Sequence, residues 1–110
     1  MNDLDREKAL SIVRKQLTVP RFEHTIRVMD TALQLGELYR VDKMKTELAA
    51  IFHDYAKYRD REEMKRWIIK ERLPHDLLAY HPELWHGPVG AILVEREVGI
   101  HDIDILNAIR

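Results

Sequence analysis

Cysteine is absent from this sequence, and its absence excludes several kinds of site at once. Disulfide bridges, thiolate metal ligands and cysteine nucleophiles are all ruled out. A metal ion bound by this chain must therefore take its ligands from imidazole and carboxylate groups.

An excess of charge of one sign is also lacking. The 18 lysines and arginines are balanced by 19 aspartates and glutamates, so the formal net charge is −1. Domains that bind polymeric nucleic acid usually carry a basic excess, and we expect no such partner. A small phosphorylated substrate needs only a few local cations and remains open.

Long apolar runs are missing as well. No stretch approaches the roughly 20 residues that cross a bilayer. Residues 1–8 are charged and resemble neither a signal peptide nor a transit peptide. We therefore expect no membrane contact and a cytoplasmic location.

Proline and glycine are scarce, with four of each, and they stand where helices should begin or end. Sustained alternation of apolar and polar residues, which predicts strands, does not occur. The length of 110 residues suits one domain with its own core. We expect an all-α domain over residues 1–110, a bundle of about five to six helices.

Caps and breakers place six helices along the chain, separated by one looser stretch from His75 to Trp85. The first expected helix runs from a cap at Asp3 to about Leu17, and the second has Pro20 in its first turn and ends near Tyr39. The third runs from Lys43, after Asp42, to about Tyr55, and the fourth from a cap at Asp60 to a stop at Pro74. The fifth runs from Val89, after Pro88, to about Val98 before Gly99, and the sixth begins at Ile103 after a cap at Asp102.

Six histidines occur, and three of them have an ordinary explanation. Two His-Asp pairs, His75-Asp76 and His101-Asp102, place the aspartate where a helix cap is needed. His81 precedes a proline in the looser stretch and is expected on the surface or in a loop.

The third pair, His53-Asp54, lies inside the apolar residues 48–57. A carboxylate beside a core face is costly unless it is paired or bound to a cation. The residues leave two readings open: a hydrogen-bonding pair at a helix end, or a metal or catalytic pair. Lys57 follows His53 by four and Asp54 by three, so we expect it on their helix face, although it is equally explained as a solvated lysine.

His24 and His86 are the remaining histidines. His24 lies early in the second helix on its interior flank, where a lone histidine is more often a satisfied core residue. His86 precedes the fifth helix, and the positive end of that helix favours a neutral imidazole ring that can bind a metal ion. Alternatively, His86 only packs beside Trp85. Three inward histidines and one carboxylate together make a plausible site for Zn, Mn or Fe.

An ordered set of motifs resembles the HD-domain phosphohydrolases: Arg21-Phe22-Glu23-His24-Thr25 with Val28, then His53-Asp54-Tyr55-Ala56-Lys57. Later motifs resemble the YqeK branch, whose members are symmetrical diadenosine tetraphosphate hydrolases. These are Leu84-Trp85-His86-Gly87-Pro88-Val89-Gly90-Ala91, Gly99-Ile100 and Leu106-Asn107-Ala108-Ile109.

This resemblance implies a dinuclear metal site, commonly iron, in an HD-domain helical bundle. It implies that His24, His53 and Asp54 hold one metal ion, and that Asp54 bridges to a second held by His86. Asp54 and Lys57 are then the catalytic candidates, and Arg21 and Lys57 contact the substrate phosphates.

The implied reaction is metal-dependent cleavage of diadenosine tetraphosphate to two ADP, because two cations offset phosphate charge and generate a nucleophile. Two alternatives remain. One is an HD phosphohydrolase for another nucleotide, such as a nucleoside phosphate or a guanosine alarmone. The other is an inactive helical module that binds a nucleotide or a partner.

The sequence departs from the family at its C-terminal end. The family has a further ligand histidine, in a His-Thr context, shortly after the Ala-Ile pair, and an aspartate ligand further on. We therefore expect a domain without its C-terminal helices, weakly active or inactive, that binds at most one metal ion tightly. We also expect the apolar face of the last helix, Ile103, Leu106 and Ile109, to need a cover beyond Arg110 or in a homodimer.

Overall fold

The computed structural model describes residues 4–110, and the side chains of Tyr39 and His75 are left aside. Over these residues the regular elements are all helical, which confirms the predicted all-α class. The α-helices are α1 (Arg6–Arg14), α2 (Val19–Tyr39), α3 (Lys43–Phe52), α4 (Arg61–Lys70), α5 (His86–Leu93) and α6 (Ile103–Ile109). Two 3₁₀ segments, η1 (His75–Ala79) and η2 (Pro82–Leu84), and a π turn, η3 (Val94–Val98), complete the order.

Side-chain caps explain where most of these helices begin. A cap oxygen accepts a hydrogen bond from an otherwise unpaired amide of the first turn. The expected caps at Asp42, Asp60 and Asp102 are confirmed. The cap expected at Asp3 lies outside the described residues, and α1 instead follows a cap at Asp5.

Several helix boundaries differ from the predicted ones. α3 ends at Phe52 rather than near Tyr55, and residues 53–58 form turns. The ring of His53 bonds the carbonyl oxygen of Ala50 at 2.6 Å, which satisfies a carbonyl at the end of the helix. α1 ends at Arg14, earlier than the expected Leu17, because a tight turn precedes the cap of α2.

Two further expectations near the looser stretch were wrong. α5 begins at His86 rather than at Val89, so His86 lies within the helix instead of before it. Asp76 does not cap a helix, because Pro74 occupies the position before η1 and Asp76 falls inside the first turn. Pro74 has a φ of −50° there, which its ring permits.

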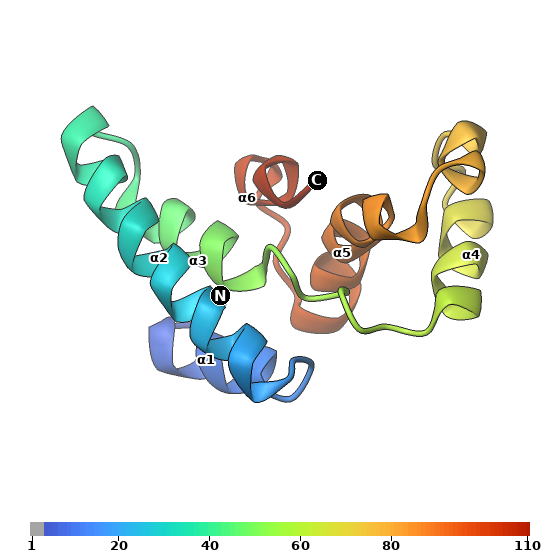
Figure 1. Cartoon of the computed structure of the whole chain (residues 1–110). Coiled ribbons are helices and arrows are strands. Elements are labelled where there is room, and N and C mark those ends of the chain that lie inside the picture. Colours follow the sequence, from blue (N-terminus) through green and yellow to red (C-terminus); the bar gives the residue numbers. More distant parts are fainter. Residues whose placement is uncertain (1–3) are drawn as a thin grey trace.

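α3 lies at the centre of one half of the molecule, where it packs against α1, α2 and α6. α5 packs against α6 and α4 in the other half (Figure 1). The turn after α3 crosses from the first half to the second, and it carries the His-Asp pair. The largest fully buried side chains come from both halves and include Phe52, Ile51, Ile68, Leu93 and Val13.

Most of the apolar face of α6 is covered by the chain itself. Leu106 and Ile109 are buried, and so is Ile105, whereas Ile103 is 57% exposed. α6 packs on α3 and α5. For the exposed Ile103, a cover beyond Arg110 or in another copy stays a prediction. None of the described helices is long and apolar enough to cross a membrane.

Candidate metal and phosphate site

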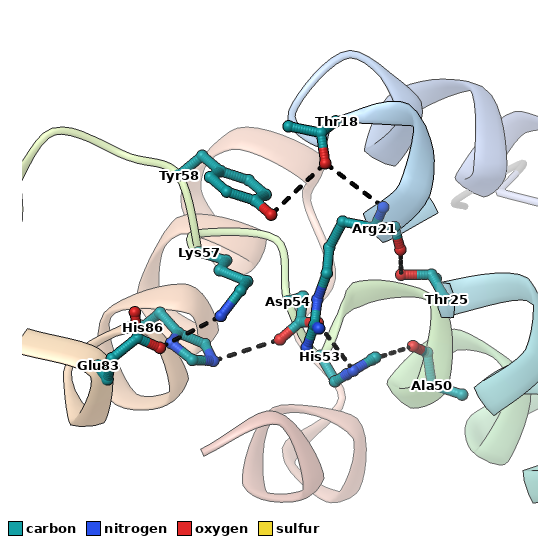
Figure 2. A network of polar contacts seen from close by, with 10 residues as sticks. All are labelled: Thr18, Arg21, Thr25, Ala50, His53, Asp54, Lys57, Tyr58, Glu83 and His86. Atoms are coloured by element: carbon teal, nitrogen blue, oxygen red, sulfur yellow. Dashed lines mark hydrogen bonds and ion pairs between the residues drawn. The ribbon is translucent and has the colours of Figure 1, made fainter. Parts of the chain in front are cut away.

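Asp54 is the centre of a polar cluster and is only 2% exposed. Its Oδ2 lies 3.1 Å from Nε2 of His53, and its Oδ1 lies 3.2 Å from Nε2 of His86. The two carboxylate oxygens therefore have imidazole neighbours on different sides, one from the end of α3 and one from the start of α5 (Figure 2).

His24 reaches the same cluster from α2. One ligand atom each from His24, His53 and Asp54 lie within 4.8 Å of one another, which is compatible with binding one metal ion. The rings of His24 and His53 are 6.1 Å apart between centroids. The fold thus brings together the four side chains that the sequence nominated as ligands, with His86 on the far oxygen of Asp54.

The ring of His53 is oriented by the backbone. Its Nδ1 donates to the Ala50 carbonyl oxygen when protonated, which leaves Nε2 to face Asp54 and the cluster. Metal-binding histidines are commonly fixed in this way by a carbonyl on the other ring nitrogen. The hydrogen bond to Asp54 raises the pKa of His53, whereas burial and the charge of Arg21 lower the pKa of His24.

The carboxylate of Asp54 remains ionised. Burial would raise its pKa, but hydrogen bonds from His53, His86 and Arg21 outweigh burial and hold the pKa well below its usual range. An ionised carboxylate with neighbouring imidazoles is a donor set that suits Mn, Fe or Zn. The residues present therefore fit a transition metal ion.

Arg21 contacts Asp54 directly. Its Nε and Nη2 both lie 2.7 Å from Oδ2, the oxygen that also neighbours His53. The sequence predicted that this guanidinium contacts substrate phosphates. In this structure it instead pairs with the carboxylate of Asp54. Its side chain is 31% exposed, so it borders the solvent side of the cluster.

Lys57 pairs with Glu83 and does not share a helix face with His53 and Asp54 as predicted (Figure 2). The helix-face argument was wrong, because α3 ends at Phe52 and no helix joins His53 to Lys57. A turn places it instead, with its amide bonded to the Asp54 carbonyl oxygen at 2.9 Å. Its Nζ pairs with Oε2 of Glu83 at 3.2 Å.

Some neighbours of the site were missed by sequence reasoning. Glu83 is an exposed acid in the looser stretch, and nothing in its local sequence marks it as a partner of Lys57. His81 accepts from the Glu83 amide, and His101 is 76% exposed beside Glu95, so both lie outside the ligand cluster as expected.

Comparison with known proteins agrees with this geometry. Residues 21–110 match the family model described as HD domain. The chain belongs to the HD domain family. The match begins at Arg21 and includes every residue of the cluster around Asp54.

Relatives of this HD domain include proteins named bis(5'-nucleosyl)-tetraphosphatase, symmetrical. The one from Bacillus subtilis is 56% identical over 97% of this chain and 58% of its own length. The one from Halalkalibacterium halodurans is 55% identical over 97% of this chain and 57% of its own length.

A solved structure from Clostridium acetobutylicum, described as a predicted HD superfamily hydrolase involved in NAD metabolism, has the same fold. It matches with a TM-score of 0.86 and 32% identity, over 96% of this chain and 57% of that one. The chain thus spans a little more than half the length of these relatives.

Proposed function

We propose that this HD domain catalyses metal-dependent hydrolysis of a phosphoanhydride in a nucleotide, and that its substrate is diadenosine tetraphosphate, cleaved symmetrically to two ADP. The observation that carries the proposal is the buried, ionised Asp54 with imidazoles beside both of its oxygens. The names of the Bacillus and Halalkalibacterium relatives support the choice of substrate.

In this proposal His24, His53 and Asp54 hold one metal ion, and Asp54 with His86 borders a second position. Bound transition metal ions supply Lewis-acid charge and a nucleophile near neutral pH. Iron is the proposed metal, with Mn and Zn as alternatives. The 4.8 Å grouping of three ligand atoms supports one tight position in this chain.

The basic side chains of Lys57 and Arg21 bind the substrate phosphates in this proposal. Lys57 is only 19% exposed and its partner Glu83 is 63% exposed, so a phosphate group can replace the carboxylate without displacing a buried residue. Arg21 can turn from Asp54 to the same phosphate chain, because a metal ion bound in the cluster would neutralise the charge of Oδ2 in its place. Fixed cations at the leaving phosphate stabilise charge that develops in the transition state.

A second candidate substrate is favoured by one comparison. The Clostridium protein is described as involved in NAD metabolism, which supports another dinucleotide with a phosphoanhydride bond as substrate. A cytoplasmic location and a homodimer stay predictions. The non-enzymatic binding module stays the alternative to an enzyme.

The test is product analysis. The chain is freed of metal with chelator, supplied with Mn²⁺ or Fe²⁺, and incubated separately with diadenosine tetraphosphate and with NAD. We expect slow turnover of the first, with ADP as its only product. ATP with AMP as products would reject symmetrical cleavage, and turnover of NAD alone would favour the second substrate. No turnover of either by a chain that binds the metal ion would favour the binding module. Asp54→Asn should be inactive, whereas His101→Ala, a histidine outside the cluster, should match the wild type.

A further inference from the structure

A second polar cluster includes residues of the segment that carries Asp54 and Lys57. The acid at its centre is Glu97. The hydroxyl of Tyr55 donates to Oε1 of Glu97 at 2.7 Å. Arg59 donates to both oxygens of the same carboxylate, at 2.7 Å to Oε1 and 3.0 Å to Oε2. The Arg59 guanidinium also lies 5.5 Å from the centre of the Tyr55 ring, and further bonds tie it to Gln16 and Glu63.

The residues that Glu97 contacts are interleaved with those of the site. Tyr55 follows Asp54 directly, and Arg59 is two residues after Lys57. The segment from Tyr55 to Arg59 is not a regular helix. It is held by short turns, in which the amides of Tyr55, Lys57 and Arg59 donate hydrogen bonds to carbonyl oxygens three residues earlier. Such a segment opens easily unless tertiary contacts anchor it.

Glu97 owes its position to the π turn at the end of α5. The helix changes at Val94 to the wider π geometry, and the amide of Gly99 closes the turn on the Val94 carbonyl oxygen at 3.1 Å. One wider turn changes the direction of the residues that follow, and π turns occur often near functional sites. Gly99 then takes a φ of 87°, which glycine adopts without strain.

We propose that Glu97 is a positioning residue for the metal and phosphate site. By binding Tyr55 and Arg59 together, it fixes the turn that presents Asp54 and Lys57. Two-pronged, charge-assisted bonds to a guanidinium are suited to this task because they fix orientation as well as distance. The role in catalysis rests on the proposed function, whereas the anchoring of the turn does not.

Arg96 provides a matched control. It is the neighbour of Glu97 in the same π turn, and its described contacts are an ion pair with Glu71 and a cation–π contact with Trp67 on α4. Arg96→Ala removes an ion pair from the same turn but leaves the contacts of Tyr55 and Arg59 in place. It thus separates the anchoring of the site from general support of α5.

The first measurement is amide hydrogen exchange in the metal-free chain, followed by NMR. In Glu97→Ala we expect roughly tenfold faster exchange at Tyr55, Lys57 and Arg59, since a lost charged hydrogen bond contributes about that factor. Glu97→Gln keeps an acceptor oxygen and should fall between. Arg96→Ala should leave these three amides unchanged.

Exchange that is unaltered in Glu97→Ala would overturn the proposal. So would an equal acceleration of amides throughout the molecule, or the same acceleration in Arg96→Ala, because either marks general destabilisation.

The second measurement is Mn²⁺ affinity by titration calorimetry. Loss of support around metal ligands commonly weakens binding by about 10–100-fold, and we expect a loss in that range for Glu97→Ala and none for Arg96→Ala. If wild type binds Mn²⁺ and Glu97→Ala binds it equally well, the positioning role is wrong and the proposed function stands. If wild type binds no Mn²⁺, the proposed function fails, and hydrogen exchange still decides whether Glu97 anchors the turn.

Discussion

Asp54 illustrates how one buried charge is stabilised by its neighbours. An unpaired carboxylate in a protein interior is strongly destabilising, and it is tolerated when donors surround it. Here the donors are Arg21, His53 and His86, and among the described residues no buried side-chain nitrogen or oxygen lacks a hydrogen-bond partner. Removing one donor therefore leaves a charge that the remaining two must satisfy.

Arg21→Ala should lower the free energy of unfolding of the metal-free chain. Loss of a charged partner from a buried group costs about 1–3 kcal/mol, and the partial exposure of Arg21 argues for the lower part of that range. Arg21→Lys keeps the charge but not the two-nitrogen contact and should fall between. Denaturant unfolding with chelator present measures this, with the exposed Arg27→Ala on the same helix as control. Equal midpoints for Arg21→Ala and Arg27→Ala would contradict the role of the contact.

At the scale of helices, two glycines of α5 lie near the C-terminal end of the chain with different surroundings. A Cβ on Gly87 would lie 3.2 Å from the Arg110 carbonyl oxygen and 3.3 Å from that of Ile109. A Cβ on Gly90 would meet its nearest neighbours at 3.6 Å or more, which is ordinary contact. The backbone at the end of α6 thus comes close to α5 at Gly87.

Gly87→Ala should destabilise the protein, and Gly90→Ala should not. At Gly87 the methyl group presses on backbone, and overpacking of this kind costs roughly 1–3 kcal/mol. The following proline adds a further penalty, since it disfavours helical geometry in any preceding residue with a side chain. At Gly90 the better helix propensity of alanine should raise stability by up to about 1 kcal/mol. Thermal unfolding of both variants decides, and a lower Tm for Gly90→Ala than for Gly87→Ala would contradict this account.

At the scale of the whole molecule, the site joins the two halves of the fold. His24 and His53 come from the half built on α3, and His86 comes from α5 in the other half (Figure 1). A metal ion held by His24, His53 and Asp54 would bind only the folded chain, because the unfolded chain does not bring these residues together. Metal binding should therefore stabilise the fold as a unit.

Mn²⁺ added to the metal-free chain should raise Tm. At about 100 times Kd the gain is about 2.7 kcal/mol, which corresponds to roughly 10–20 °C for a domain of this size. We expect at most one tightly bound ion per chain. The rise should disappear in His24→Ala and persist in His101→Ala, whose histidine is exposed and outside the cluster. Scanning calorimetry and elemental analysis measure both, and two tightly bound ions, or no rise, would contradict the prediction.

The sequence alone determined the features that depend on near neighbours. Caps act within three residues, so Asp42, Asp60 and Asp102 predicted where three helices begin. Apolar spacing and the lack of alternation predicted an all-helical domain. The residue types nominated His24, His53, Asp54 and His86 as ligands, and the structure places them together, although their role as ligands stays a prediction.

Tertiary structure decided what depends on distant partners. Arg21 pairs with a residue 33 positions away, and Tyr55 with one 42 positions away, so no local pattern reports either contact. The end of α3 and the place of Lys57 follow from how the chain crosses between the two halves, which helical spacing does not record. The cover of α6 likewise came from α3 and α5. Local free energies of capping and turn formation are fixed by adjacent residues, whereas burial and charge pairing exist only once the chain has folded.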